Sequence, residues 1–150
     1  MKYNISVKIR KLHEDSCIPK KQTEFSAGYD LHAYCKEYPI IIPPGKLGLV
    51  PSGVSMEIPV GYDLEIRPRS GISTKFLVII PNSPGTIDSD YRGEIFVPML
   101  NLSEKDFEIQ HGMRIAQGVI RKTYNISWDI VQELDLSSNR GTGGFGSTGV

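Results

Sequence analysis

Residues 84–94 contain the largest group of side chains in this sequence that could take part in chemistry. Three acids lie there close to a tyrosine and an arginine, directly after a Pro-Gly turn: Asp88, Asp90, Glu94, Tyr91 and Arg92. Apolar runs at 76–80 and 95–100 flank the stretch, which predicts two strands joined by a hairpin or a bulge. Loops in such positions commonly carry function because a rigid scaffold holds them. On these residues alone, a polar surface turn without a chemical role is the alternative.

A second group, Arg69-Ser70-Gly71, has the parts of an anion-binding site. A guanidinium pairs well with phosphate or carboxylate, and a glycine lets the backbone approach a ligand closely. We expect a short helical turn over residues 71–76, whose free N–H groups would add to such a site. The alternative is a serine that caps this turn beside a solvated arginine.

The C-terminal arm, residues 139–150, is rich in glycine but also contains Arg140 and Phe145. Its glycines formally match G-x-G-x-x-G, yet a dinucleotide site needs a strand before this motif and a helix after it. We therefore reject that interpretation and expect a flexible arm that closes over a phosphorylated ligand. Arg140 would contact phosphate and Phe145 would stack on a ring, whereas a plain disordered tail is the alternative.

The overall composition narrows the class of protein. Lysine plus arginine and aspartate plus glutamate both total 17, so the net charge is near zero, which argues against binding to a nucleic acid polymer. The two cysteines, Cys17 and Cys35, have no metal-ligand spacing, and we expect them to be reduced thiols. No apolar run has the length of a signal peptide or a membrane span, so we expect a cytoplasmic protein without a membrane partner.

Short alternating or apolar runs, separated by turn residues every eight to twelve positions, predict an all-β sandwich or barrel. Ten prolines and fifteen glycines fit this class better than a helical bundle. We expect residues 107–109 to pair with 114–120 across a turn at His111-Gly112. The single tryptophan, Trp128, is predicted to lie in the core.

Five stretches in the right order resemble the five motifs of the homotrimeric dUTPase family, and they span residues 27–149. They are Ala27 to Leu31, Arg67 to Gly71, Asn82 with Gly85 to Glu94, Arg114 to Gln117, and Arg140 to Gly146. The resemblance implies a distorted β jelly roll with one short helix, formed by residues 1–138, followed by the flexible arm. It also implies a homotrimer with shared active sites, Mg²⁺, and hydrolysis of dUTP to dUMP and pyrophosphate, which keeps uracil out of DNA.

The same resemblance implies a role for individual residues. Asp88 would deprotonate the water that attacks the α-phosphorus, with Gln117 as the other catalytic position, and Tyr91 would pack on the deoxyribose. Asp30 would orient waters on Mg²⁺. The remaining substrate contacts implied are Arg69, Ser70, Gly71 and Gln117 at phosphate, Asn82, Gly85, Thr86 and Ile87 at uracil, and Arg140, Phe145 and Gly146 in the arm.

Two departures and two rivals accompany the resemblance. Ile72-Ser73 and Gly118 stand where the family often has other residues, and neither touches a proposed chemical role. A dCTP deaminase has the same fold and a similar Arg-Ser turn, but Asp88 with Tyr91 and the glycine-rich arm favour the hydrolase. A jelly roll that only binds a ligand is the non-enzymatic rival.

Overall fold

The computed structural model describes residues 4–144, and within this range it contains eleven strands and one helix. The strands are β1 (Lys8–Lys11), β2 (Tyr29–His32), β3 (Ile40–Ile42), β4 (Leu47–Pro51), β5 (Val54–Glu57), β6 (Tyr62–Pro68), β7 (Val78–Ile79), β8 (Gly85–Ile87), β9 (Phe96–Asn101), β10 (Phe107–Ile109) and β11 (Arg114–Lys122). The helix α1 spans Ser70–Phe76. This all-β architecture with one short helix confirms the predicted fold class.

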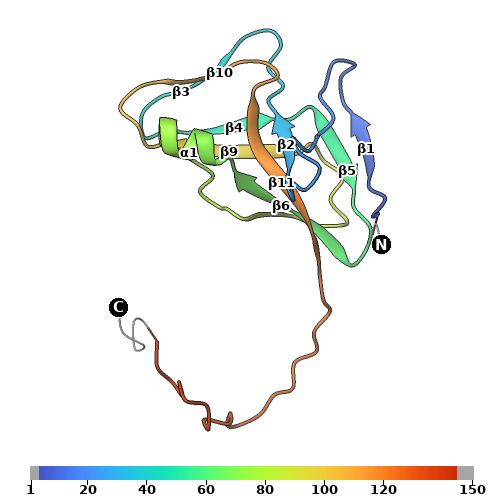
Figure 1. Cartoon of the computed structure of the whole chain (residues 1–150), viewed down its shortest axis with the longest axis vertical. Coiled ribbons are helices and arrows are strands. Elements are labelled where there is room, and N and C mark those ends of the chain that lie inside the picture. Colours follow the sequence, from blue (N-terminus) through green and yellow to red (C-terminus); the bar gives the residue numbers. More distant parts are fainter. Residues whose placement is uncertain (1–3, 145–150) are drawn as a thin grey trace.

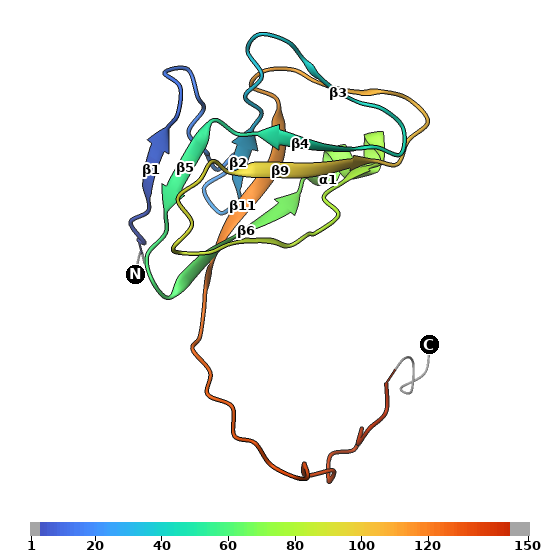
Figure 2. The same ribbon diagram turned by 180° about the vertical axis from the view of Figure 1, so that it is seen from behind.

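All strand pairs in the described range are antiparallel, and they form four small sheets. One has the order β2-β11-β6-β8 and another β4-β9-β7, while β1-β5 and β10-β3 form two-stranded ribbons. Figures 1 and 2 show the sheets arranged around a common interior, with α1 at one end of the β4-β9 layer. Buried aliphatic side chains from nearly every strand fill this interior, as expected when alternate residues of each strand point inward. Among the most enclosed are Leu31, Ile42, Val50, Val78, Ile95, Val97, Met99, Ile109 and Ile115.

The runs on either side of the acidic stretch do pair, as the sequence predicted. Val78 lies opposite Asn101, and Ile79 lies opposite Leu100. The connection between them is longer than a simple hairpin, however, because it contains β8. This short strand leaves the β7-β9 pair and joins β6 in the other sheet. The acidic stretch therefore links two layers of the fold.

The predicted pairing of residues 107–109 with 114–120 is wrong. Strand β10 pairs with β3, whereas β11 pairs with β2 on one side and β6 on the other. The turn itself exists, with Gly112 at φ +76°. Ala33 exchanges backbone hydrogen bonds with Gly112 and Met113, so the chain leaving the turn is captured by the end of β2.

After β11 the chain leaves the body, and the red segment in Figures 1 and 2 runs away from all the strands. The predicted core position of Trp128 is therefore wrong for the single chain, in which this residue is 83% exposed. Tyr124, Ile126 and Ile130 are also exposed, and with Trp128 they alternate at every second position. Such alternation is typical of a strand that buries one face, although this segment has no strand partner among residues 4–144. No helix in that range has the length and apolar character to cross a membrane.

Candidate functional site

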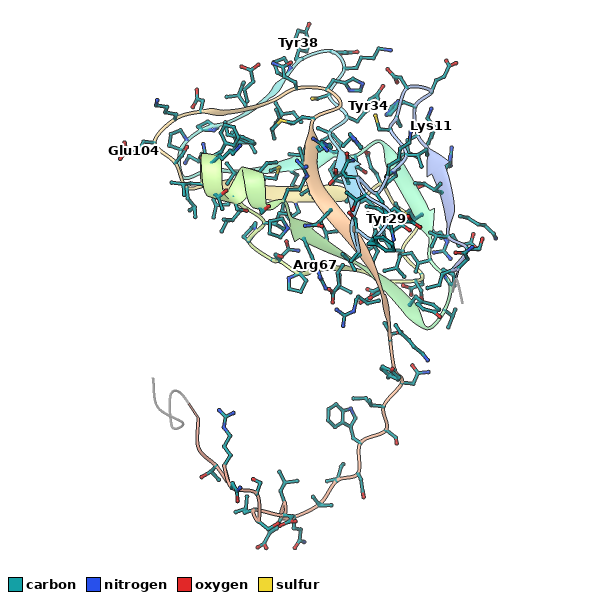
Figure 3. All side chains as sticks on the ribbon, viewed as in Figure 1. Lys11, Tyr29, Tyr34, Tyr38, Arg67 and Glu104 are labelled. Atoms are coloured by element: carbon teal, nitrogen blue, oxygen red, sulfur yellow. The ribbon has the colours of Figure 1, made fainter. Side chains whose placement is uncertain are left out.

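Asp30, Gln117 and Arg67 form a row across three neighbouring strands of the largest sheet. Gln117 lies opposite Asp30 of β2 and also opposite Arg67 of β6. Residues that face each other in a sheet project their side chains to the same side. The register alone thus joins three stretches that are far apart in the sequence, and Figure 3 shows Arg67 on β6 at the edge of this body.

Asp30 is the most enclosed ionisable side chain of this row, with only 6% of its surface exposed. Its Oδ1 accepts a hydrogen bond from Nε of Arg69 at 3.0 Å, and its Oδ2 accepts one from Nη1 of Arg114 at 3.3 Å. A buried carboxylate needs such partners, because an unpaired buried charge is strongly destabilising. Asp30 therefore holds two guanidinium groups beside the start of α1.

Arg114 was not among the predicted site residues. It stands three residues before Gln117 in β11, opposite His32 of β2, and only this register brings its side chain to Asp30. In the sequence, Arg114 is only the first residue of the Arg114 to Gln117 stretch. Nothing near it in the sequence indicates that its side chain pairs with Asp30. Together with Arg69 it doubles the positive charge beside the start of α1.

A small hollow opens beside these arginines. It has a volume of about 280 Å³, and it is lined by the cations Arg69, Lys75 and Arg114 together with Gly71, Ile72, Phe76 and Met113. Ser70 and Gly71 begin α1 and are exposed, and Arg69 immediately before them has extended backbone. The predicted Arg69-Ser70-Gly71 group thus borders a hollow with an excess of positive charge, which suits an anion.

Gln117 is fixed by close packing on both sides. Its Nε2 donates a hydrogen bond to the carbonyl oxygen of Pro68 at 3.0 Å. A Cβ atom at position 28 would lie 2.2 Å from Gln117 Oε1, so a side chain there would displace the Gln117 amide. The absence of a side chain at Gly28 therefore makes room for the amide. A Cβ at Gly118 would similarly lie 2.8 Å from Leu64 Cδ1, so this glycine makes room for the core.

His32 belongs to the same neighbourhood, and burial lowers its pKa below the usual 6.5. The Asp30 carboxylate opposes this shift, whereas the positive charges of Arg114, Arg69 and Lys20 add to it. The buried Nδ1 atom of His32 has no hydrogen-bond partner in the described part of the chain. The imidazole is therefore neutral at physiological pH.

This lowered pKa predicts a pH-dependent loss of stability that His32→Gln removes. As the pH falls below 6.5, His32 becomes protonated in the unfolded chain but stays neutral in the folded chain. The free energy of unfolding therefore decreases with falling pH until the lower pKa of the folded protein is reached. Melting temperatures of both proteins should be compared between about pH 8 and pH 5. We expect the wild type to lose more than the variant as the pH falls. Parallel curves would show that His32 does not titrate in this way.

The loop from Asn82 to Ile87 presents backbone next to β6. Gly85 and Ile87 pair with Ile66 and Leu64, which places Thr86 opposite Glu65. The Asn82 side chain folds back toward Gly85. Its Nδ2 atom would lie 3.1 Å from a Cβ atom placed on that glycine. Gly85 is buried, whereas the side chains of Asn82 and Thr86 are exposed.

Asp88 and Tyr91 form a tight turn directly after β8. The backbone N–H of Tyr91 donates to the Asp88 carbonyl at 3.1 Å, and the Tyr91 hydroxyl donates to the Glu94 carbonyl at 2.9 Å. Both side chains are exposed, with 43% of the Tyr91 surface open to solvent. The turn therefore exposes a carboxylate and an aromatic ring within four residues of each other.

The single chain does not bring Asp88 to the arginines around Asp30. Ile87 lies opposite Leu64, near the start of β6, and Arg69 directly follows the end of that strand. Arg69 is the fifth residue after Leu64, and at about 3.3 Å per residue the two positions are roughly 16 Å apart. Asp88 lies one residue further away, so the predicted base and the predicted phosphate group stand at opposite ends of β6.

The arm residues are also separate from both groups. Arg140 is exposed, and its Nε donates a hydrogen bond to the nearby Gly143 carbonyl at 2.9 Å. In Figure 3, the side chains that follow β11 project from a segment that has no strand or helix up to residue 144 and lies away from the body. The two other arm residues predicted at the site, Phe145 and Gly146, lie outside the described residues.

Comparisons with known proteins match nearly the whole chain to a single family. The dUTPase family profile matches residues 14–149. A deoxyuridine 5'-triphosphate nucleotidohydrolase of Leptospira interrogans is 53% identical over 141 residues, which cover 94% of this chain and 97% of that protein. The enzyme of the same name from Helicobacter pylori strain Shi470 is 51% identical over 146 residues, covering 97% and 98%.

A solved structure gives the same result. The dUTPase of Staphylococcus bacteriophage 80alpha with dUPNHPP superposes with a TM-score of 0.87 at 26% identity, covering 97% of this chain and 99% of that one. The jelly-roll layout, the row of Asp30, Gln117 and Arg67, and the turn with Asp88 and Tyr91 occur in a chain that is matched over nearly its whole length. The chain belongs to the dUTPase family.

Proposed function

We propose that this chain hydrolyses dUTP to dUMP and pyrophosphate in the cytoplasm, and that Asp88 holds and deprotonates the attacking water. The family match over residues 14–149 supports the reaction. The turn after β8 supports the role of Asp88, because its side chain is exposed in the same turn as Tyr91 and is accessible to a water molecule. A positioned general base contributes a factor of about 10²–10⁴ to such a reaction.

The neighbouring loop would select the base and the sugar. Asn82, Gly85, Thr86 and Ile87 would contact the uracil edge, where backbone groups of β8 lie close to the surface. Cytosine has an amino donor where uracil has a carbonyl acceptor, so the wrong base would leave buried polar groups unpaired. Sites of this kind discriminate by roughly 10⁴–10⁵. The Tyr91 ring would lie on the deoxyribose and leave no space for a 2′-hydroxyl.

The triphosphate would bind at the arginine-rich hollow beside α1. Arg69 and Gly71 line this hollow, with Ser70 between them in the chain. Gln117 donates a hydrogen bond to the carbonyl of Pro68, the residue directly before Arg69. Arg69 already pairs with Asp30, so phosphate oxygens would compete with this carboxylate for the guanidinium. Arg114, which also contacts Asp30, would keep the carboxylate in place when Arg69 turns to the substrate.

The residues present fit a magnesium ion that is held mainly by the substrate. Within residues 4–144 no group of three or more His, Cys, Asp or Glu side chains is placed to hold a metal. A buried Asp30 beside the phosphate hollow suits the role of orienting metal-bound waters rather than direct ligation. When bound, Mg²⁺ would neutralise charge on the triphosphate and fix its geometry.

A complete site would need residues from more than one copy of the chain. The separation of Asp88 from Arg69 along β6 is the observation that carries this proposal, because one nucleotide must meet both groups. Two groups of exposed apolar side chains also suit contacts between copies. One is the β4-β9 face, where Leu47 is 56% and Leu49 63% exposed, and the other is the alternating segment that contains Trp128. Both support an assembly of several copies, and we propose the homotrimer with shared active sites that the resemblance to the family implies.

Mixing two inactive variants would test the sharing of sites. If Asp88 and Arg69 of one site come from different copies, co-expressed Asp88→Asn and Arg69→Ala chains will form some sites with both natural residues. Random assembly then restores about a quarter of the wild-type rate of pyrophosphate release, although each variant alone is inactive. No recovery in mixed trimers would mean that each copy supplies both groups.

A further inference from the structure

We infer that Glu94 is a positioning residue that fixes the orientation of Tyr91, and through it the preference for deoxyribose over ribose. The inference rests on the proposed contact between Tyr91 and the sugar. Glu94 makes two hydrogen bonds in different directions, one through its side chain and one through its backbone carbonyl. These bonds connect the exposed turn around Tyr91 to the body of the protein.

The side-chain bond joins two loops that are far apart in the sequence. Oε1 of Glu94 accepts a hydrogen bond from the backbone N–H of Gly53 at 2.7 Å. Gly53 lies in the turn between β4 and β5 and is buried, so its N–H has to find a partner inside the protein. A bond to a charged acceptor is stronger than one between neutral groups. The Glu94 carboxylate therefore holds the acidic loop against this turn.

The turn that receives Glu94 is itself tightly held. Gly53 has φ +70°, and a Cβ atom there would lie 2.5 Å from Ser16 Oγ and 3.1 Å from Tyr34 Cβ. Its carbonyl accepts a hydrogen bond from the backbone N–H of Leu12 at 2.9 Å. The anchor for Glu94 is thus fixed by the loop after β1 as well as by β5.

The chain is fixed after Glu94 but exposed before it. Ile95 is fully buried, its N–H donates to Val54 at 3.0 Å, and its carbonyl accepts from Ser52 at 3.1 Å. Within the described chain, the hydrogen bonds of residues 88–93 stay inside the loop: Tyr91 N–H to the Asp88 carbonyl, Arg92 Nη1 to the Ser89 and Tyr91 carbonyls, and Tyr91 hydroxyl to the Glu94 carbonyl. Glu94 is therefore the point at which this loop is fastened to the body.

The backbone bond transmits this anchoring to the aromatic ring. The Tyr91 hydroxyl donates to the Glu94 carbonyl at 2.9 Å. A Cβ atom on Gly93 would lie 2.4 Å from that hydroxyl oxygen, so the ring packs directly on the glycine backbone. Contact with Gly93 and the bond to Glu94 together set the tilt of the ring. If the Glu94 side chain releases Gly53, the carbonyl that holds the hydroxyl is free to shift.

The test compares kcat/KM for dUTP and UTP in variants at both ends of this connection. We expect Glu94→Ala to lower the preference for dUTP about tenfold, because a charge-assisted bond and the partner of a buried N–H are lost. Glu94→Gln keeps an acceptor oxygen and should keep most of the preference. Tyr91→Phe, which loses only the hydroxyl bond, should resemble Glu94→Ala. The matched control is Glu108→Ala, an exposed glutamate on β10, with wild-type preference expected.

Tyr91→Ala separates failure of this inference from failure of the proposed function. If Tyr91→Ala leaves the preference unchanged, the role of Tyr91 is wrong and the role of Glu94 falls with it. If Tyr91→Ala lowers the preference while Glu94→Ala leaves it unchanged, only the positioning role is overturned. Should Glu94→Ala fail to fold, Glu94→Asp replaces it, since the shorter side chain withdraws from Gly53. A lowered preference in Glu94→Asp but not in Glu94→Gln supports the inference, and equal behaviour of the two overturns it.

Discussion

Asp88→Asn is expected to slow the hydrolysis of dUTP by about 10²–10⁴-fold, the contribution of a positioned general base. The substitution preserves the size of the side chain and its place after β8, but an amide cannot take a proton from water. Nucleotide binding should change little, because the surrounding contacts remain. Steady-state turnover measures the first effect, and calorimetric titration with the non-hydrolysable analogue dUpNHpp measures the second.

Asp90→Asn is the matched control for this experiment. Asp90 is an exposed acid in the same turn, two residues away, and it has no proposed role. It should keep nearly the full rate, and the wild type should release pyrophosphate from dUTP and no ammonia from dCTP. A near-normal rate in Asp88→Asn, or an equal loss in Asp90→Asn, would remove Asp88 from the role of base.

Deletion of the C-terminal arm, residues 139–150, is expected to lower the rate by about 10²-fold while the assembly stays intact. The arm supplies Arg140, Phe145 and Gly146, which are proposed to close over the bound nucleotide, and loss of such positioning has effects of this size. The apolar surfaces that suit contacts between copies lie outside the arm, on β4, on β9 and before residue 139. Turnover and light scattering on the same sample give both results.

Arg140→Ala is the companion to the deletion, since it removes one proposed phosphate contact and leaves the glycines. It should lower the rate less than the deletion does and should leave the molecular mass unchanged. Dissociation of the truncated protein would instead assign the arm a structural role. A truncated protein with the wild-type rate would show that the arm takes no part in catalysis.

Local sequence patterns predicted the strands of this fold well. The alternation from Tyr62 to Ile66 became part of β6, and the turn residues around Pro51 and Gly53 separate β4 from β5. A short helical turn was also expected, at residues 71–76, and α1 spans Ser70–Phe76. Each of these features depends on neighbours in the chain, which is the information that a sequence presents directly.

Features that depend on distant partners could not be predicted in this way. The pairing of β10 with β3 follows from the capture of Gly112 and Met113 by Ala33, which lies about eighty positions earlier. The contact between Arg114 and Asp30 likewise depends on strand register. Trp128 is apolar, as a core residue would be, but nothing local shows that its own chain does not cover it.

The same distinction applies to the candidate site, whose residues could be named from the sequence but whose contacts could not. The resemblance to a family named Asp30 and Arg69 as site residues with separate roles, whereas the structure joins them in one ion pair at 3.0 Å. The reason that Gly28 is a glycine became visible only when Gln117 was seen packed against it. The distance between Asp88 and Arg69 along β6 is also invisible in the sequence, and it is the strongest support for sites that are shared between copies.

A structure of the assembled protein with dUpNHpp and Mg²⁺ tests this account most directly. The quantity to measure is the distance from each Asp88 carboxylate to the nearest α-phosphorus, together with the copy that supplies Arg69 to the same nucleotide. We predict one water molecule between the Asp88 carboxylate and the α-phosphorus, with Arg69 contributed by a different copy. An Asp88 carboxylate remote from every bound nucleotide would contradict the account.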